Sequence, residues 1–473
     1  MLDLTKHKEA EAFLSFFAEI SKIPRGSGNT KGIADHLVDF ARSRNLEFYR
    51  DEADNVVIKK PATKGYEDRP TVMIQGHTDM VLQAASGVTK DMDNEGVELV
   101  IDGDFLRAEG TTLGADDGIA VAYALAILDS RDIPHPDIEA IFTSDEEIGL
   151  IGATALDCSE LKGKTMINID SDVEGVFTVG CAGGRRVDIK LHVERADVSG
   201  NKYTLIVDGL LGGHSGVEID KGRTNATKRI AEYLAALGDI RLISLSGGVA
   251  DNAIPPSATA EFISDKCPDA ISEIIDGLKE ALPENAEHET VTLIKSGECD
   301  SALTAKSTNA LISLIRELPD GIIAMSADIE GQVETSLNLG ILRLEEGHAS
   351  ISFSLRSSKE KEKQALADRV ASIVASYGAE ISEHGDYPGW EFKKDSHLRG
   401  VMCKVYGETY GKDAEVITIH AGLECGIFSD KIEGLDCVSA GPDAFDIHTP
   451  KERLSISSAV RFWNYLLNVL KNI

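Results

Sequence analysis

Residues 71–81 read TVMIQGHTDMV, an apolar run that gives way to polar residues at His77 and Asp79. The pattern predicts a buried β-strand that delivers side chains at its carboxyl end. The same pattern recurs in IEAIFTSDEEIG (138–149) and KTMINIDSD (164–172). Ligands bind open α/β sheets outside the carboxyl ends of the strands. Three strands that each end in acidic residues or histidine therefore locate a candidate site.

The flanking segments predict how this sheet is completed. Helical spacing occurs at 11–23, 33–41 and 118–128, and LEFYR and NVVIKK are extended candidates before the first motif strand. Such alternation favours an α/β sheet with helices on both faces. After residue 183 the pattern changes to alternating strands and amphipathic helices, which predicts an inserted α+β domain. The turn residues YPGW would return the chain to the first domain, so the predicted domains are a discontinuous α/β domain of 1–183 and 387–473 and an insertion of 184–386.

Length and charge narrow the class of protein. The 473 residues exceed the roughly 250 to 300 at which one core stops growing, so two domains are expected. Acidic side chains outnumber basic ones by 79 to 48, and the net charge of −31 would repel a phosphate backbone or anionic lipid. Nucleic acid and membrane are poor candidate partners. Solubility alone also explains such a charge, so the acidity does not identify a substrate.

The amino terminus and the cysteines bear on cellular location. The start, MLDLTKHKEAEAFL, has charges where a signal peptide needs an apolar segment, and no run approaches the ~20 apolar residues of a membrane span. We therefore expect a cytoplasmic protein. The 7 cysteines are scattered and include no CxxC pair, which argues against a disulfide framework and a thiolate zinc site. Small buried residues are the expected role for them.

An ordered set of acidic and histidine motifs carries the chemistry. Taken singly, an HxD can be a strand end, a DDG a helix cap and a DEE a solvated face. Together they supply what two divalent ions need, namely a bridging anion, ligands for each ion and a base for a shared water. Imidazole and carboxylate ligands suit Zn²⁺, and also Mn²⁺ or Co²⁺. The motifs are GHTDM, GADDG, SDEEIG, INIDSD and, much later, DIHTP.

The set resembles the co-catalytic metallopeptidase superfamily of aminoacylases, tripeptidases, carnosinases and glutamate carboxypeptidases. Longer stretches resemble one branch of it, the aminoacyl-histidine dipeptidases. These stretches occur in one order across nearly the whole chain: SKIPRGSGN, GTTLGADDGIAVAYALAIL, SDEEIGLIGA, GLLGGHSGVEIDKGRTNA, DNAIP, ISFSLRSS, YPGWEF and IHAGLECGIF. The resemblance implies a zinc-exopeptidase-like catalytic domain interrupted by an inserted lid and dimerisation domain.

The resemblance also implies roles for the metal ligands. Asp116 would bridge two ions, with His77 on one ion and His448 on the other. Glu147 and Asp170 would each complete one coordination sphere.

The same resemblance assigns the groups around the metals. Glu146 would be the general base, taking a proton from the water and passing it to the leaving amine. Asp79 would hold His77 in the correct tautomer. Asp117 and Asp172 are not expected to be ligands but helix-capping or ligand-orienting groups.

Three residues of the insertion resemble substrate-holding groups of the family: His214, Asn252 and Arg356. Arginine binds carboxylates through a rigid donor fork, and His or Asn could donate to the scissile carbonyl. A buried structural salt bridge is the alternative for Arg356. In related enzymes the histidine can come from a partner subunit, which makes a homodimer the expected assembly.

Other polar residues receive no step. His420 and Glu424, in IHAGLECG, match the branch but have no assigned role. His36, His135 and His384 have no metal-ligand spacing and are expected at the surface.

The function predicted is hydrolysis of unblocked dipeptides, Xaa-His or a broader set, by a metal-activated water with Glu146 as base. The nearest alternative is a sister activity, N-acyl amino acid hydrolysis or carboxypeptidase action. An alternative of another class is a non-catalytic binding protein on the same fold. A phosphoesterase would need a basic cluster beside the motifs, and the sequence has none there.

Overall fold

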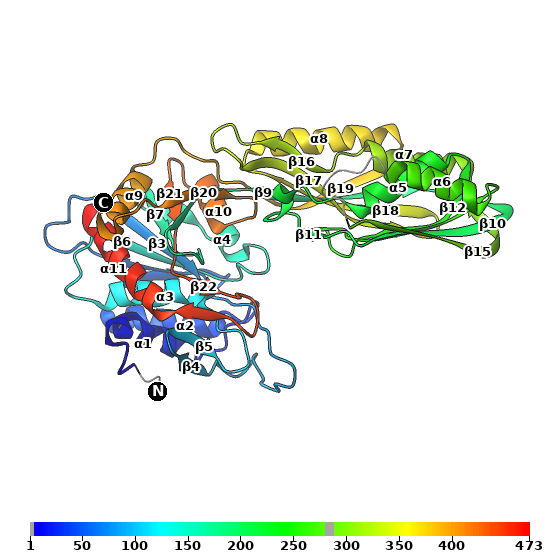
Figure 1. Cartoon of the computed structure of the whole chain (residues 1–473). Coiled ribbons are helices and arrows are strands. Elements are labelled where there is room, and N and C mark those ends of the chain that lie inside the picture. Colours follow the sequence, from blue (N-terminus) through cyan, green and yellow to red (C-terminus); the bar gives the residue numbers. More distant parts are fainter. Residues whose placement is uncertain (1–3, 280–287) are drawn as a thin grey trace. The chain divides into compact units, whose positions relative to one another are not determined.

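The computed structural model describes residues 4–279 and 288–473, which form two compact units. The first contains Met1–Gly180, Phe392–Thr418 and Leu423–Ile473, and the second contains Cys181–Glu391 and Ile419–Gly422. The colours of Figure 1 follow this division, because the blue to cyan and the orange to red segments share one unit while green and yellow fill the other. Each unit has a large hydrophobic core of its own.

An eight-stranded mixed sheet forms the centre of the first unit, in the order β1-β2-β6-β3-β7-β21-β8-β20. Its strands are β1 (Glu47–Arg50), β2 (Val56–Lys60), β3 (Val72–His77), β6 (Ile138–Thr143), β7 (Thr165–Asn168), β8 (Val176–Cys181), β20 (Glu415–Ile419) and β21 (Asp436–Ser439). The neighbours β6-β3, β3-β7 and β7-β21 run parallel. Parallel strands end at the same edge, so the predicted motif strands β3, β6 and β7 deliver their last residues to one place. The sequence prediction of an α/β fold is confirmed.

Helices cover both faces of this sheet. Gly76 faces α3, since a Cβ there would lie 2.4 Å from the Cβ of Ala120, while its neighbour Gln75 contacts Glu424 of α10 on the other face. The carboxyl-terminal helix returns to the first third of the chain, where the Tyr123 hydroxyl donates to the Ala459 carbonyl at 2.7 Å. The helices are α1 (Glu11–Ile20), α2 (Lys31–Arg44), α3 (Ala115–Asp129), α4 (Ile151–Ala155), α9 (His397–Tyr410), α10 (Glu424–Lys431) and α11 (Ile456–Asn472).

A small antiparallel sheet completes the first unit, in the order β22-β23-β5-β4. It joins strands far apart in sequence, β4 (Leu99–Asp102), β5 (Phe105–Ala108), β22 (Ala444–Phe445) and β23 (Arg453–Ser455). Its β22-β23 connection carries His448.

The second unit is an antiparallel sheet with helices. The nine strands run β15-β10-β14-β12-β17-β18-β9-β19, with β16 beside β17. They are β9 (Gly183–His192), β10 (Arg195–Asp208), β12 (Ile240–Gly247), β14 (Ala258–Ser264), β15 (Thr290–Leu303), β16 (Gly321–Met325), β17 (Val333–Leu344), β18 (His348–Ser357) and β19 (Glu380–Tyr387). A two-stranded sheet pairs β11 (Gly213–His214) with β13 (Ala253–Ile254). The helices are α5 (Ala226–Leu237), α6 (Pro268–Lys279), α7 (Ala305–Glu317) and α8 (Glu360–Ser376).

Surface features correct two expectations. His135 is buried, with Nδ1 2.7 Å from the Pro136 carbonyl, so its expected place at the surface is wrong, whereas His36 is half-buried and His384 exposed. Cys267 is exposed and three other cysteines are half-buried, so the expectation of uniformly buried cysteines is also wrong. Within residues 4–279 and 288–473 no disulfide joins any of them.

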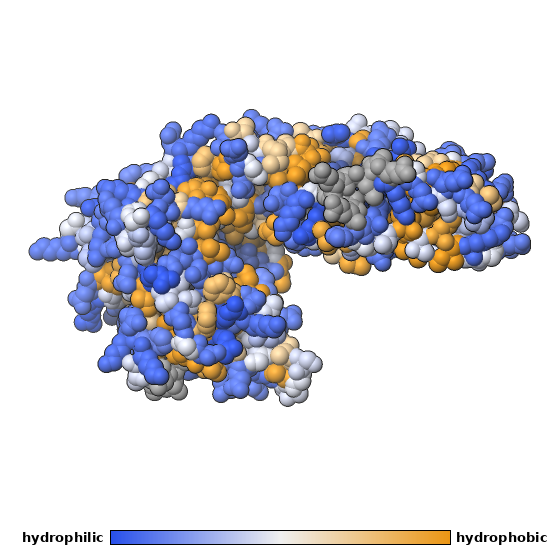
Figure 2. Space-filling model, in the orientation of Figure 1, coloured by the Kyte–Doolittle hydropathy of each residue, from blue (hydrophilic) through white to orange (hydrophobic). Residues whose placement is uncertain are grey.

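The surface is dominated by polar side chains. Figure 2 shows a mostly hydrophilic face with scattered hydrophobic residues, as the net charge of −31 suggests. Among the described helices, none combines the length and apolarity needed to span a bilayer.

Candidate metal centre

His77 and Asp116 are the first pair that the strand ends bring together. His77 is the last residue of β3, and Asp116 lies at the start of α3, where its backbone is not helical. The Nε2 atom of His77 is 3.0 Å from Oδ1 of Asp116 and 4.0 Å from Oδ1 of Asp170, which follows β7. These three residues form one group whose donor atoms lie within 4.8 Å of one another.

The second oxygen of Asp116 faces a second histidine. His448 Nε2 lies 3.1 Å from Asp116 Oδ2 and 2.9 Å from Glu147 Oε1. Asp116, Glu147 and His448 therefore form a second group of donor atoms within 4.8 Å. Asp116 belongs to both groups through different oxygens, which is the geometry that a bridging carboxylate requires.

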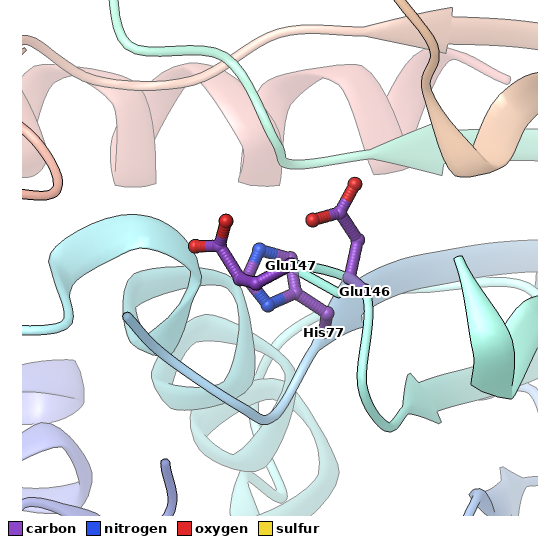
Figure 3. Close-up of side chains that lie close together, drawn as sticks. All are labelled: His77, Glu146 and Glu147. Carbon is purple, nitrogen blue, oxygen red and sulfur yellow. The ribbon is translucent and has the colours of Figure 1, made fainter. Parts of the chain in front are cut away.

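Glu146 lies beside both groups. It makes a third group with His77 and Glu147, and Figure 3 shows the two carboxylates on either side of the His77 ring. The structure thus brings together the six residues predicted as metal ligands or general base. They are His77, Asp116, Glu146, Glu147, Asp170 and His448.

Asp79 is fully buried and its carboxylate contacts His77, Glu146 and Glu147. One carboxylate oxygen is 3.3 Å from His77 Nδ1 and accepts the Glu146 N–H at 3.0 Å. The other accepts the Glu147 N–H at 3.3 Å and the Ser27 hydroxyl at 2.8 Å. A carboxylate on Nδ1 leaves Nε2 as the nitrogen that faces Asp116, the orientation a metal ligand needs.

Asp117 contacts the backbone of a candidate ligand. Its Oδ2 accepts the His77 N–H at 3.2 Å, so it orients rather than joins the donor groups. Gly76 makes room for it, because a Cβ at that position would come within 2.5 Å of Asp117 Oδ2. Asp172 lies in the loop after β7, and its carbonyl accepts the Ala444 N–H.

The electrostatics show a surplus of negative charge. Burial and the adjacent Asp116 raise the pKa of Asp170 to about 8, and burial raises the pKa of Glu146 well above its usual value. Asp116 and Glu147 raise the pKa of His448 to about 10. Burial opposes the ionisation of Asp116, but hydrogen bonds from both histidines hold its pKa far below the usual range. Bound divalent cations would allow these neighbouring carboxyl groups to be ionised together.

The donor set fits divalent ions. It offers two imidazole nitrogens and three carboxylates in two groups that share one residue. Glu147 Oε1 is buried and lacks a hydrogen-bond partner among the described residues, although His448 lies beside it. A buried oxygen of this kind is one that an ion would satisfy.

Two positioning residues escaped the sequence analysis. Glu452 is buried, and its carboxylate accepts the N–H groups of Leu113, Gly114 and Ala115 at 2.8 to 3.0 Å, which fixes the turn before Asp116. Arg25 is buried and donates to the carbonyls of Thr78 and Gly114 at 2.9 and 2.6 Å, which joins the segment after His77 to the segment before Asp116. The only sequence signals were their places in HTPKER and SKIPRGSG, neither of which suggests a partner.

The second unit gathers the predicted substrate-holding residues. His214 in β11 pairs with Ala253, so Asn252 lies directly beside it, and the Ser215 N–H donates to the Asn252 carbonyl at 2.8 Å. His214 Nδ1 accepts the N–H groups of Gly216 and Val217 at 3.0 and 3.3 Å. An accepting Nδ1 in a neutral ring places the proton on Nε2, which is then a free donor.

Arg356 lies in β18 opposite Ser336 of β17. The residue is 8% exposed, and its guanidinium donates to the Tyr387 hydroxyl at 3.0 Å. Across the described ranges no carboxylate lies within 4 Å of it, so the alternative of a structural salt bridge finds no support. Ser336 also contacts His420 at 2.7 Å, and burial together with Arg356 lowers the pKa of His420 to about 3. Arg356 therefore stands among neutral groups.

The sequence matches Peptidase family M20/M25/M40 over residues 73–472. It is 35% identical over 468 residues to the cytosol non-specific dipeptidase of Escherichia coli (strain K12), covering 97% of this chain and 96% of that protein. The crystal structure of aminoacylhistidine dipeptidase from Vibrio alginolyticus matches with a TM-score of 0.92 and 34% identity over 99% of both chains. Aminopeptidase PepT from Bacillus cereus ATCC 10987 matches with a TM-score of 0.58 and 17% identity over 98% of both chains, which shows a shared fold alone.

Proposed function

Because the chain belongs to Peptidase family M20/M25/M40, and is thus an enzyme that hydrolyses peptide bonds, we propose that it cuts unblocked dipeptides with two divalent metal ions. Asp116 carries the proposal, since its two oxygens face His77 and His448 separately. The relatives named as a non-specific dipeptidase and an aminoacylhistidine dipeptidase support this substrate class. Xaa-His dipeptides are the preferred substrates in this proposal.

The two ions would be held by the two donor groups. His77 and Asp170 would hold one ion, His448 and Glu147 would hold the other, and Asp116 belongs to both donor groups. Nitrogen and oxygen ligands favour Zn²⁺, with Mn²⁺ or Co²⁺ as substitutes. Bound there, the pair would acidify a shared water and polarise the scissile carbonyl.

Residues of the chain move the proton. Glu146 takes it from the attacking water and delivers it to the nitrogen of the leaving amino acid. Burial raises the pKa of Glu146, which brings the carboxyl closer to the range in which it can both accept and return a proton. Asp79 keeps His77 in the required tautomer and anchors the backbone of Glu146.

Residues of the second unit hold the substrate. Arg356 has no carboxylate partner among the described residues and would bind the free carboxylate of the dipeptide. The Nε2–H of His214 would donate to the carbonyl oxygen as negative charge develops there, with Asn252 beside it. In this proposal the insertion, residues 184–386, serves as lid and dimerisation domain of a cytoplasmic homodimer.

A metal-reconstitution assay tests the proposal. The purified protein is stripped with chelator, reloaded with Zn²⁺ or Mn²⁺, and assayed against carnosine, Xaa-His and other dipeptides, a tripeptide and an acetylated amino acid. Metal-dependent cleavage of dipeptides is expected. The variant Glu146→Gln should keep its metal and lose activity by about 10²- to 10⁴-fold, because the general base is gone.

The other outcomes separate the alternatives. Cleavage of acylated substrates alone would establish the sister amidohydrolase activity. A protein that binds neither metal and cuts nothing would be the non-catalytic alternative. Fastest turnover on dipeptides without histidine would reject the Xaa-His preference and keep the dipeptidase.

A further inference from the structure

Polar side chains interrupt the buried strands of the first unit just before the metal centre. Gln75 and Asn168 pair directly across β3 and β7, and Thr143 pairs with His77 across β6 and β3. All three side chains are fully buried. In a parallel sheet, directly paired residues point to the same face, so these groups form a row beneath His77.

One carboxyl group terminates this row. Oε2 of Glu424, the first residue of α10, accepts the Thr143 hydroxyl at 2.7 Å and the Gln75 amide at 2.5 Å. The Gln75 carbonyl oxygen accepts the Asn168 amide at 2.6 Å. One hydrogen-bonded chain thus runs from Glu424 through Thr143, Gln75 and Asn168, which lie at or near the carboxyl ends of β6, β3 and β7.

Burying this row of polar groups lowers the stability of the fold. Glu424 is 0% exposed, and burial raises its pKa to about 7. Its Oε1 and the Asn168 Oδ1 are buried without hydrogen-bond partners within the described structure. Buried polar networks that are only partly satisfied are usually less stable than apolar packing. Such a network therefore calls for a reason other than stability.

The position of the row supplies the reason. Gln75 is two residues before His77, Asn168 two before Asp170, and Thr143 three before Glu146. Each strand that delivers a group to the metal centre is therefore tied to the others immediately before that group. Apolar contacts would tolerate a small slip between the strand ends, whereas directional hydrogen bonds do not.

We propose that Glu424 is a positioning residue for the metal centre, whose carboxyl fixes the ends of β3, β6 and β7 through Thr143, Gln75 and Asn168. The inference rests on the proposed metal-dependent function. Groups that orient metal ligands typically change metal affinity by about 10- to 100-fold when they are removed. Glutamine can reproduce both accepted hydrogen bonds through its oxygen, whereas leucine can reproduce neither.

Three variants test the proposal by metal competition with a chromophoric chelator and by steady-state kinetics. Glu424→Leu should bind Zn²⁺ about 10- to 100-fold more weakly and lose kcat more than it raises KM. Glu424→Gln should restore both toward wild type. Glu139→Leu is the matched control, because Glu139 is also buried in β6 but at the far end, where it accepts the Gly163 N–H at 2.9 Å. It should lower the Tm and leave Zn²⁺ affinity unchanged.

The outcomes are separable. Wild-type Zn²⁺ affinity in folded Glu424→Leu would overturn the inference, as would a Gln variant as impaired as the Leu variant. If Glu424→Leu does not fold, Thr143→Val removes one donor with little change of shape and should weaken Zn²⁺ binding; unchanged binding there would also overturn it. Failure of the wild-type protein to bind Zn²⁺ would instead reject the proposed function.

Discussion

The predicted site residues of the two units differ in the sign of their buried charge. In the first, Asp116, Glu147 and Asp170 converge with two histidines at the ends of parallel strands. In the second, the buried Arg356 lies among neutral partners, since burial and its own positive charge lower the pKa of both His214 and His420. Buried charges in proteins are paired or bind ions. The first unit therefore has the electrostatics of a cation site and the second those of a carboxylate site, and a dipeptidase needs both.

The largest effect is expected from the first unit's shared residue. Asp116→Asn replaces the carboxylate whose two oxygens face His77 and His448, so both ions should bind at least about a hundredfold more weakly and turnover should fall to background. Metal content by mass spectrometry and dipeptide turnover measure the two effects. His448→Gln should instead lose one ion and keep the other.

The control for this prediction is Asp157→Asn. Asp157 belongs to the same unit but caps the turn at Cys158–Glu160 through the Ser159 N–H, and its loss should change neither metal content nor turnover. If the Asp116→Asn variant still binds two ions, Asp116 is not the bridging ligand. The cation site of the first unit would then have to lie elsewhere.

A smaller effect is expected from His214 in the second unit. Its Nδ1 accepts two backbone N–H groups, so the Nε2–H is available to a developing oxyanion. His214→Ala should lower kcat by about 10²- to 10³-fold, with metal content unchanged. His192→Ala, at an exposed histidine in the same unit, is the control and should have wild-type kinetics. A normal kcat in His214→Ala would remove the second unit from the chemical step.

Arg356 should affect binding more than chemistry. Hydrogen bonds to charged groups are worth about 1.5 to 3 kcal/mol, so Arg356→Gln should raise KM for dipeptides roughly tenfold to a hundredfold. Arg185 is the matched control, because it is equally buried but paired with Asp386 at 3.0 Å and Glu383 at 2.9 Å.

The two arginines should therefore separate in their phenotypes. Arg185→Gln should lower the Tm and leave KM unchanged. Arg356→Gln should raise KM and leave the Tm unchanged. An unchanged KM in Arg356→Gln would mean that its positive charge serves the fold and that the second unit is not a carboxylate site.

Much of the fold and of the metal centre could be predicted from the sequence because the informative patterns are local. Short apolar runs followed by His77 and Glu146 predicted buried strands whose carboxyl ends locate one site, and the predicted α/β fold is confirmed. Family resemblance was needed for His448, which lies more than three hundred residues from its nearest partner. The positioning groups could not be found this way. Glu452, Arg25 and Glu424 act through backbone groups or buried amides whose proximity exists only after folding.

The smallest expected effect is on stability, and it comes from Asp320, a carboxyl of the second unit that does not contact Arg356. Asp320 accepts the Leu339 N–H at 2.8 Å and the Asn225 amide at 3.2 Å, and burial raises its pKa to about 6 from 3.8. The folded protein thus binds this proton more tightly than the unfolded chain. The contribution of Asp320 to stability is fully present below pH 4 and is lost as the pH rises to about 6.

Asp320→Asn removes that loss while keeping an oxygen acceptor for both bonds. Allowing for partial exposure, the gain at pH 7.5 should be about 1 kcal/mol, or roughly 2 °C in Tm, with only about a third of that gain at pH 4.5. Thermal unfolding of both proteins at the two pH values measures it. Because Asp320 touches neither the donor groups nor Arg356, turnover and KM should not change. A Tm difference that is the same at both pH values would show that burial does not perturb this carboxyl, and a change in KM would show that the carboxylate site of the second unit extends to it.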